Sequence, residues 1–403
     1  MSILVDIIPS KTYAHRLMIC AALSETPCEV QCDFHSDDLD ATRRCLQAIR
    51  EGSGVLDCGE SGSTLRFMLP VAAALGISAE FRTSGRLMDR PMSPLSDELA
   101  SHGCRLSPPG VSPLRIEGQL RPGTFIMPGN VTSQFVSGLL MALPILGKES
   151  RIIVSGRLQS SAYVDCTLDV LEQFGIRVEV EARETGRTYI IPGKQVFRCP
   201  EVCLPEGDWS GAANWLLAGA IGKEPVSVRG LKTDSKQADR QIVEILRQFG
   251  AKVETEGDVV TCYPSSLTGN KVDISGNPDL APVIALAGAC AAGETRIVNA
   301  LRLRMKESDR ITSICSVLSG LGVHTEELPD EIHIQGRRDE LLQGGTFSSE
   351  NDHRIVMMEA VASLRSDSPI RIEGAEAVNK SYPGFFRVME EAGLAGNVEQ
   401  IGE

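Results

Sequence analysis

One phrase recurs along the chain where a helical pattern of apolar residues gives way to a β-rich pattern. Each copy ends in a glycine, and successive glycines are 72, 75, 72 and 71 residues apart. A residue that tolerates positive φ is favoured just after a helix. We therefore predict a helix C-terminus at each of these positions: Gly103, Gly175, Gly250, Gly322 and Gly393.

A second recurring phrase is a small or polar opening followed by an apolar, alanine-rich helical pattern. It begins at Lys11, Gly62, Ser133, Ser210, Asp279 and Asp352. The two phrases together define six units of about seventy residues, the first visibly shortened between Gly52 and Gly59. This period exceeds the roughly 20 to 50 residues of solenoid repeats, so each unit is predicted to be a small α/β subdomain. Three units per domain is the natural grouping.

The helices that follow these openings are apolar nearly all round, which predicts that they are buried. A buried helix with a polar first turn directs its free backbone N–H groups and positive dipole end at whatever lies before it. Several such ends brought together would form an anion site. Each opening Ser, Thr or Asp is also typical of an N-cap residue, and the two interpretations are compatible.

Composition fixes the broad class of protein. With 403 residues, 42% of them apolar, the chain can bury the cores of two or three domains. A formal net charge of -13 argues against a nucleic-acid partner, which needs clustered positive charge. Any anionic ligand must therefore be met by local basic clusters.

Compartment signals are few. The first residues lack the features of a signal peptide, and the apolar stretch from Leu280 to Gly293 is shorter than the roughly 20 residues that cross a bilayer. We expect a cytoplasmic protein without a membrane role. The 12 cysteines are scattered without C-x-x-C pairs, so we predict reduced core thiols rather than disulfides or a metal framework.

Basic residues cluster at the predicted helix starts despite the acidic total. They are Lys11 with Arg16, Arg66, Arg90, Lys306 with Arg310, Arg354, and Lys380. One such residue would be a solvated surface charge. Cations placed repeatedly at polar entries to apolar helices indicate polyanion binding.

Four motifs carry a resemblance to a known family. They are Gly59-Glu-Ser-Gly-Ser-Thr-Leu-Arg66, Lys306-Glu-Ser-Asp-Arg310, Asn351-Asp-His-Arg354 and Lys380-Ser-Tyr-Pro383. In this order, along a likeness that runs from Ser10 to Phe386, the chain resembles the 3-phosphoshikimate 1-carboxyvinyltransferases, or EPSP synthases. The resemblance implies an inside-out α/β fold of six βαβαββ units, three per domain around a pseudo-threefold axis.

The resemblance also implies the domain bounds and the activity. Residues 11–205 would form an N-terminal domain, mainly on the shikimate 3-phosphate side. Residues 1–10 with 206–403 would form the domain with the acid/base residues and the phosphoenolpyruvate clamp. The implied reaction transfers the enolpyruvyl group of phosphoenolpyruvate to the 5-hydroxyl of shikimate 3-phosphate, releasing phosphate, in aromatic amino-acid biosynthesis. It implies no cofactor or metal, a monomer, and glyphosate as inhibitor.

The resemblance assigns site residues by position. The shikimate 3-phosphate ligands would be Lys11, Thr12, Arg16, Ser133, Gln134, Ser160, Tyr163, Asp279 and Lys306. The phosphoenolpyruvate ligands would be Lys11, Gly62, Arg90, Gln134, Arg310, Arg354 and Lys380. The catalytic residues would be Asp279, which takes the hydroxyl proton, Glu307, which protonates C3, and Lys11. Arginine suits such ligands because its planar group pairs bidentately with phosphate and carboxylate.

The chain departs from the family pattern in three places. Glu60-Ser61-Gly62-Ser63 stands where many members have Asn-Ala-Gly-Thr, so the hydrogen bond of that Asn is in question. Arg302 stands where some members have Asn. The short stretch before Ser10 leaves room for little of the usual opening strand.

Two alternatives remain. The first is the related enolpyruvyl transferase that acts on UDP-N-acetylglucosamine. Its reactive cysteine precedes an Ala-Arg-Pro sequence, whereas the matching stretch here, Gly85 to Pro91, contains no cysteine. The second is a non-catalytic repeat scaffold, in which the charged residues would be solvated charges and helix caps. A scaffold gives no reason for paired carboxylates among so many predicted phosphate ligands.

Overall fold

The repeat glycines follow helix ends in the structure. The computed structural model describes residues 2–26, 28–130, 132–156, 158–183 and 185–401. All five repeat glycines have positive φ, between 69° and 101°. Gly175, for example, follows the helix α6 (Ser161–Gln173) and its C-cap Phe174. The predicted helix C-termini are confirmed.

The chain folds as two compact units, which we call the N-terminal unit (Lys11–Pro205) and the C-terminal unit (Met1–Ser10 with Glu206–Glu403). The two chain segments that flank residues 11–205 pair with each other: Pro9 forms an antiparallel bridge to Gly207. The side-chain amide of Gln237 bonds to both segments, accepting from the Ser10 hydroxyl at 3.0 Å and donating to the Gly207 carbonyl at 2.8 Å.

The C-terminal unit contains three sheets. Two have four strands in the same order, β1-β10-β12-β11 and β13-β14-β16-β15, whose first two strands are parallel and the others antiparallel. The third, β17-β18-β19, is parallel throughout. The strands are β1 (Ile3–Asp6), β10 (Val226–Arg229), β11 (Val253–Glu256), β12 (Val259–Cys262), β13 (Lys271–Asp273), β14 (Glu294–Val298), β15 (His324–Glu327), β16 (Glu331–Gln335), β17 (Gly345–Ser348), β18 (Ile370–Glu373) and β19 (Val398–Ile401). The helices are α7 (Trp209–Ile221), α8 (Ile242–Gln248), α9 (Ala281–Ala289), α10 (Arg310–Gly320), α11 (His353–Ala362) and α12 (Phe385–Glu391), with 3-10 helices η3 (Ala238–Gln241), η4 (Pro278–Leu280), η5 (Leu301–Met305), η6 (Ser363–Arg365) and η7 (Ala375–Lys380).

The N-terminal unit repeats the four-stranded pattern twice, as β2-β3-β5-β4 and β6-β7-β9-β8. Its strands are β2 (Val55–Gly59), β3 (Ala79–Thr83), β4 (Cys104–Leu106), β5 (Leu114–Gly118), β6 (Thr124–Pro128), β7 (Ser150–Ser155), β8 (Glu179–Arg183) and β9 (Gly186–Ile191). Its helices are α1 (Lys11–Ala22), α2 (Asp37–Arg50), α3 (Gly62–Leu75), α4 (Leu95–Ser101), α5 (Ser133–Ala142) and α6, with η1 (Gly85–Asp89) and η2 (Leu143–Ile145).

Not all six repeats carry the full βαβαββ pattern. Four do, whereas the last has the three parallel strands β17, β18 and β19. The first contributes the helices α1 and α2 and, among the residues described, an isolated bridge between Ser24 and Phe197. The mixed α/β fold of six repeat units is confirmed. The first unit is shortened, as expected, and the last departs from the βαβαββ pattern in its strands.

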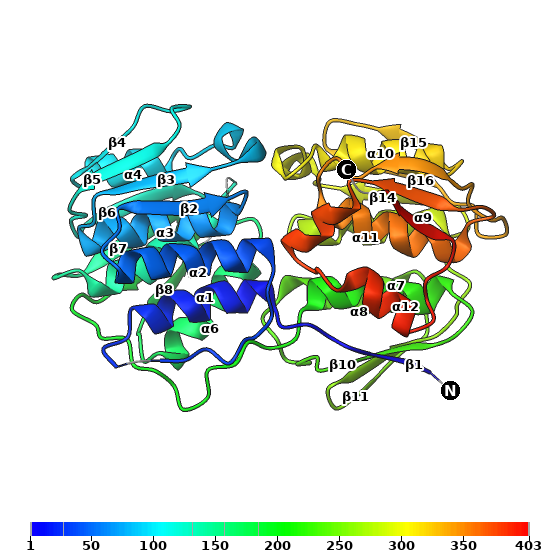
Figure 1. The fold of residues 1–403 in the computed structure, drawn as a ribbon, viewed down its shortest axis with the longest axis horizontal. Helices are drawn as coiled ribbons and strands as arrows, with labels where there is room; N and C mark the ends of the chain where they lie inside the picture. Colours follow the sequence, from blue (N-terminus) through cyan, green and yellow to red (C-terminus); the bar gives the residue numbers. More distant parts are fainter. Residues whose placement is uncertain (1, 27, 131, 157, 184, 402–403) are drawn as a thin grey trace. The chain divides into compact units, whose positions relative to one another are not determined.

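Three buried helices, α7, α9 and α11, pack against one another and lie between the strands of the C-terminal unit (Figure 1). Every residue of α9 is buried, and Ser210 is the one residue of α7 that is not. Alanine and glycine recur in α7 and α9, so their backbones can approach closely. Asp208 caps α7 and Asp352 caps α11, each accepting from a first-turn N–H. Buried helices with polar openings were predicted and are confirmed.

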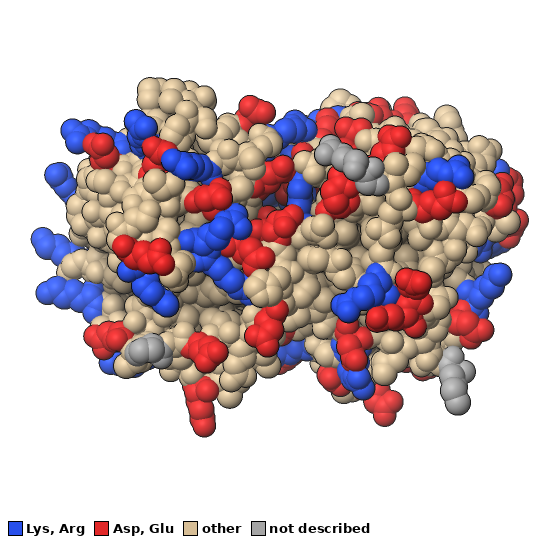
Figure 2. All heavy atoms as spheres, viewed as in Figure 1, with Lys and Arg blue, Asp and Glu red and all other residues tan. Residues whose placement is uncertain are grey.

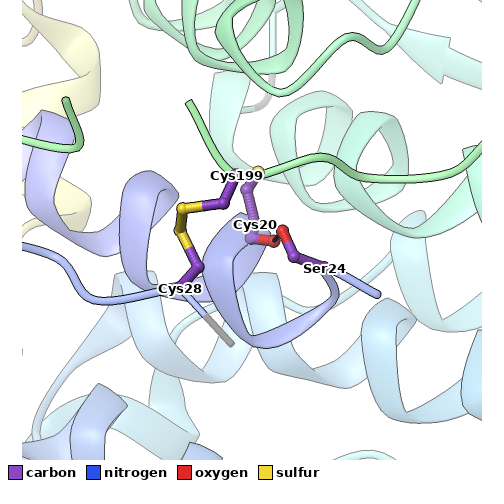
Figure 3. The surroundings of a disulfide bond; sticks show 4 residues. All are labelled: Cys20, Ser24, Cys28 and Cys199. Atoms are coloured by element: carbon purple, nitrogen blue, oxygen red, sulfur yellow. Dashed lines mark hydrogen bonds between the residues drawn. A yellow bond between two sulfur atoms is a disulfide. The ribbon is translucent and has the colours of Figure 1, made fainter. Parts of the chain in front are cut away.

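One cysteine pair contradicts the prediction of reduced thiols. Cys28 and Cys199 form a disulfide, with their Cα atoms 5.5 Å apart (Figure 3). They are 171 residues apart in sequence. Their segments run side by side because Ser24 bridges to Phe197 and the Gln31 N–H donates to the Cys203 carbonyl. The other ten cysteines form no disulfide, and all of these except Cys32 are buried.

Charge is spread over the surface. On the face drawn in Figure 2, acidic and basic side chains are interspersed. Within the described residues, no helix has both the length and the apolar composition to span a membrane.

Glu359 of α11 is a buried carboxyl in the helical core. Its side chain is 0% exposed, and neither oxygen has a hydrogen-bond partner among the described residues. Burial raises the pKa of Glu359 well above its ordinary value of 4.5, and the nearby charge of Glu350 adds to this effect. The folded protein therefore holds this side chain as a neutral acid.

We predict that Glu359→Gln flattens the pH dependence of stability. Above pH 4.5 the unfolded chain releases this proton and the folded one keeps it, so the free energy of unfolding falls by up to about 1.4 kcal/mol per pH unit. Glutamine does not titrate, so this fall disappears. Urea unfolding between pH 5 and 8 measures it through the fluorescence of Trp209 and Trp215, both in this unit. Glu244→Gln, which alters an exposed carboxylate of α8, is the control, and equal slopes in all three proteins would refute the prediction.

Candidate active site

Helix N-termini of the N-terminal unit carry several of the residues predicted for shikimate 3-phosphate. Ser133 is the first residue of α5, and Ser160 is the N-cap of α6. Ser160 is 2% exposed and adopts a left-handed backbone, with φ of 56°. Tyr163 lies in the first turn of the same helix. Free backbone N–H groups in such first turns suit anionic groups.

Arg16 joins three of these helices. Its guanidinium donates to the Thr167 hydroxyl at 2.7 Å and to the Tyr163 carbonyl at 3.0 Å in α6, and to the Ser137 hydroxyl at 3.3 Å in α5. A further bond at 2.6 Å goes to the Thr12 carbonyl, one turn earlier in α1. Arg16 is 3% exposed. These contacts fix the first turns of α1 and α6 next to each other.

Two guanidinium groups meet at Gly62. A Cβ atom on Gly62 would lie 2.9 Å from Nη1 of both Arg66 and Arg90. Arg66 also donates to the side-chain oxygen of Gln134 at 2.7 Å, and the Gln134 amide donates to the Ser63 hydroxyl at 3.0 Å. The start of α3 thus gathers two cations against the start of α5.

Lys11 is engaged by a carboxylate. Its Nζ lies 2.6 Å from Oδ2 of Asp38, in the first turn of α2. The pair is partly buried. An incoming anion must therefore compete with Asp38 for this ammonium group.

Arg310 is the centre of the C-terminal cluster. Its side chain is 1% exposed, and its Nε donates to Oδ2 of Asp352 at 2.7 Å. Its Nη2 donates to Oε2 of Glu307 at 2.7 Å, and its Nη1 donates to Oδ1 of Asp279 at 2.8 Å. Burial opposes the charge of Arg310, but these three carboxylates raise its pKa well above the ordinary value.

Asp279 is bound by three cations. Besides Arg310, Lys306 donates to its Oδ1 at 3.0 Å and Arg354 donates to its Oδ2 at 3.2 Å. Burial raises the pKa of Asp279, but Arg354, Lys306 and Arg310 together bring it well below the ordinary value. For Lys306, burial lowers the pKa, and the opposite charge of Asp279 only partly offsets this effect. Asp279 is therefore held as a carboxylate.

The C-terminal cluster is balanced in charge. Its cations are Lys306, Arg310 and Arg354, and its carboxylates are Asp279, Glu307 and Asp352. Lys380 bonds to the residue that precedes Asp352: its ammonium group donates to the Asn351 carbonyl at 2.7 Å. Across the described residues, no group of His, Cys, Asp or Glu side chains is arranged to hold a metal ion.

In the C-terminal unit, hydrogen bonds join the predicted residues Asp279, Lys306, Glu307, Arg310 and Arg354 in one network. In the N-terminal unit, predicted residues gather around Arg16 and around Gly62, and Lys11 pairs with Asp38. Sequence reasoning missed the carboxylates that hold the cations: Asp38 for Lys11 and Asp352 for Arg310. A signal existed for Asp38, because Ser36 and the acidic residues after it are typical of a helix N-terminus. No sequence signal indicated that Asp38 would pair with Lys11.

Comparison with known proteins identifies the family. The family described as EPSP synthase (3-phosphoshikimate 1-carboxyvinyltransferase) matches residues 2–389. The chain belongs to this family. The 3-phosphoshikimate 1-carboxyvinyltransferase of Clostridium kluyveri is 40% identical over 416 residues, which cover 98% of this chain and 96% of that protein. The protein of the same name from Clostridioides difficile is 36% identical, covering 98% and 96%.

Solved structures show the same fold. An EPSP synthase from Acinetobacter baumannii has a TM-score of 0.79 at 24% identity, covering 98% of this chain and 96% of that one. The enolpyruvyl transferase NikO from Streptomyces tendae has a TM-score of 0.74 at 17% identity, covering 97% and 94%. The EPSP synthase resemblance and the enzyme class are confirmed, and the UDP-N-acetylglucosamine alternative is less supported.

One departure from the EPSP synthase pattern has a structural explanation. Ser61 caps α3, its hydroxyl accepting from the Thr64 N–H at 3.2 Å. The carboxyl group of Glu60 packs over Gly85, where a Cβ would lie 2.6 Å from Glu60 Cδ. Gly85 also has a φ of 56°, so a side chain there would be strained as well as crowded.

We predict that Arg310→Met destabilises the C-terminal unit by about 3–5 kcal/mol, because three carboxylates lose their buried partner. Tryptophan-monitored urea unfolding measures this loss. Arg229→Met is the matched control, since Arg229 pairs with Asp6 at 2.6 Å on the surface and its loss should change stability little. Similar losses in the two variants would show that the buried network is not a major source of stability.

Proposed function

We propose that the chain performs the reaction of its family, transfer of the enolpyruvyl group from phosphoenolpyruvate to the 5-hydroxyl of shikimate 3-phosphate, with the clustered residues in the roles below. One observation carries the assignment of roles. Asp279 is a partly buried carboxylate held by Lys306, Arg310 and Arg354, which are cations suited to substrate phosphates and carboxylates.

Shikimate 3-phosphate is assigned to the helix starts of the N-terminal unit and to two residues of the C-terminal unit. The proposed ligands are Lys11, Thr12, Arg16, Ser133, Gln134, Ser160, Tyr163, Asp279 and Lys306. Backbone N–H groups and hydroxyls near Ser133 and Ser160 suit a phosphate. Arg16 already makes four hydrogen bonds, so its larger contribution is to hold these helix starts in place.

Phosphoenolpyruvate is assigned to the arginine and lysine groups. The proposed ligands are Lys11, Gly62, Arg90, Gln134, Arg310, Arg354 and Lys380. The pairing of guanidinium groups at Gly62 supports this assignment. Arg310 is enclosed by three carboxylates, so its contacts favour a positioning role over direct binding.

Substrate binding would change Asp279 from a weak base into a useful one. With three cations around it, its lowered pKa makes it a poor proton acceptor. An anionic substrate that draws Arg354 and Lys306 away removes much of that stabilisation. The pKa of Asp279 then rises, and its carboxylate can accept the proton of the attacking 5-hydroxyl.

Glu307 is assigned to C3 of phosphoenolpyruvate. It must give a proton during addition and recover it when phosphate is expelled. Arg310 holds it as a carboxylate at 2.7 Å, so Glu307 must first obtain a proton. We assign that step to a relay from a neighbouring group once water is excluded. Lys11 is assigned as the cation that contacts both substrates.

Cytoplasmic localisation and a monomeric state remain predictions. The disulfide between Cys28 and Cys199 is unusual for a reducing compartment, so the oxidation state of the protein in cells bears on the first.

Turnover tests the function directly. The purified protein should release phosphate from phosphoenolpyruvate in the presence of shikimate 3-phosphate but not of UDP-N-acetylglucosamine, and mass spectrometry should find the enolpyruvyl product. Release with UDP-N-acetylglucosamine alone would support the cell-wall reaction instead. No release with either would favour the scaffold.

We predict that Asp279→Asn and Glu307→Gln each lower kcat by roughly 10²-fold or more, because each removes a proton-transfer group. The affinity for shikimate 3-phosphate should change much less. Steady-state kinetics and calorimetric titration measure the two effects. Glu327→Gln alters an exposed carboxylate that pairs with Arg304 and should keep the full kcat. Full kcat in Glu307→Gln, with undiminished deuterium exchange at C3, would exclude Glu307 as the donor.

We predict that Gly62→Ala weakens glyphosate by about tenfold, or about 1.4 kcal/mol, and phosphoenolpyruvate by less. The new Cβ would press on Arg66 and Arg90, and glyphosate is the longer ligand. The inhibition constant and the KM for phosphoenolpyruvate give the comparison. Gly147→Ala, where a Cβ would meet nothing within 4 Å, is the control. Equal weakening of both ligands by Gly62→Ala would rule out the steric explanation.

A further inference from the structure

A second aspartate is buried in the C-terminal unit near Asp279. Asp239 lies in η3 and is 2% exposed. Its Oδ2 accepts a hydrogen bond from the Ser210 hydroxyl at the start of α7. Its Oδ1 is buried and has no hydrogen-bond partner among the described residues. A buried carboxylate with an unsatisfied oxygen is costly, which favours the neutral acid.

A hydrogen bond ties Asp239 to the Asp279 segment. The side-chain amide of Asn277 donates to Oε1 of Gln241 at 3.0 Å. Asp239, in η3, lies two residues before Gln241, and Asp279, in η4, lies two residues after Asn277. The two 3-10 helices are thereby held together, with their carboxyl groups close enough to influence each other.

The charged groups that act on Asp239 come from three other elements. They are Asp279 of η4, Arg354 of α11 and Asp208, the N-cap of α7. Burial, and then the charge of Asp279, raises the pKa of Asp239 to about 6, with Asp208 adding to the rise. Arg354 and the Ser210 hydrogen bond oppose it. Asp239 therefore titrates just below neutral pH.

Asp239 and Asp279 share one cation. Arg354 bonds to Asp279 and also stabilises the ionised form of Asp239 through space. Asp279 also pairs with Lys306 and Arg310, whereas Arg354 is the main cation that stabilises ionised Asp239. When an anion binds Arg354, this cation no longer stabilises the ionised form of Asp239. Protonation of one of the two interacting carboxyl groups then becomes favourable.

We propose that Asp239 is a positioning residue that takes up a proton from solvent when an anionic substrate binds Arg354, leaving Asp279 as the charged carboxylate that accepts the hydroxyl proton. This inference rests on the proposed role of Arg354 in phosphoenolpyruvate binding. No covalent bond changes in this step: the proton goes from solvent to the Asp239 carboxyl.

Proton uptake makes ligand affinity depend on pH in a defined direction. Below pH 6, Asp239 is already protonated and binding takes up no proton there. Above pH 6, up to its higher pKa in the complex, binding must bring a proton with it, so affinity falls as pH rises. A neutral residue at this position removes that fall.

The test is calorimetric titration of glyphosate into the protein saturated with shikimate 3-phosphate, at pH 7, in two non-phosphate buffers of different ionisation enthalpy. The wild type should take up roughly half a proton more than Asp239→Asn. Ionisation of glyphosate itself is common to both proteins and cancels. Between pH 6 and 8 the affinity of the wild type should fall by up to roughly tenfold more than that of the variant.

Two further variants sharpen the result. Asp234→Asn makes the same chemical change at an exposed carboxylate in the segment before η3 and should take up as many protons as the wild type. Ser210→Ala removes the bond that favours the ionised Asp239 both with and without ligand, so it should move the pH of greatest uptake upward even if Asp239→Asn fails to fold. Unchanged uptake in Asp239→Asn, or an unchanged pH of greatest uptake in Ser210→Ala, overturns this inference alone. A wild type that releases no phosphate from phosphoenolpyruvate and shikimate 3-phosphate overturns the proposed function instead.

Discussion

The buried guanidinium of Arg310 is the constraint on which the C-terminal site depends. A charge with 1% exposure is tolerated only if its hydrogen bonds are met, and Asp279, Glu307 and Asp352 meet them. These carboxylates come from η4, the segment before α10, and the N-cap of α11. The hydrogen bonds of this one guanidinium group therefore fix three segments of the repeats relative to one another. They also bring the two proposed acid/base residues, Asp279 and Glu307, into contact with the same arginine.

The same balance of charge explains how an acidic chain can serve anionic ligands. Lys306, Arg310 and Arg354 each have a carboxylate partner, so no cation of this cluster relies on solvent alone. Under the proposed roles, a substrate anion would replace a carboxylate as the partner of a cation. Recognition and activation would then be linked, because each cation that moves to substrate would make Asp279 a better base.

Sequence reasoning succeeded where one local pattern decides the outcome. Gly175 and its counterparts follow helices because positive φ favours glycine, and apolar periods read directly as buried helices. The abbreviated first repeat was visible as a shortened spacing. The three parallel strands of the last repeat were not, because strand order depends on contacts between distant segments.

Pairings across long separations also escaped prediction. The disulfide joins Cys28 to Cys199 because the bridge between Ser24 and Phe197 aligns their segments, and nothing near either cysteine encodes the other. Asp239 lies in an ordinary polar stretch, and its unusual environment comes from Asp279 and Arg354, which lie in later repeats. Sequence motifs indicated the cations of the candidate site, whereas the carboxylates that pair with them could be identified only from the folded structure.

A crystal structure of the complex with shikimate 3-phosphate and glyphosate tests the central claim most directly. The claim is that Arg354 exchanges Asp279 for substrate and frees that carboxylate to act as a base. The structure should show Arg354 bound to the inhibitor and the Asp279 carboxylate about 2.6–3.2 Å from the 5-hydroxyl. Bound ligands with Arg354 still paired to Asp279, and the 5-hydroxyl out of reach of that carboxylate, would contradict it.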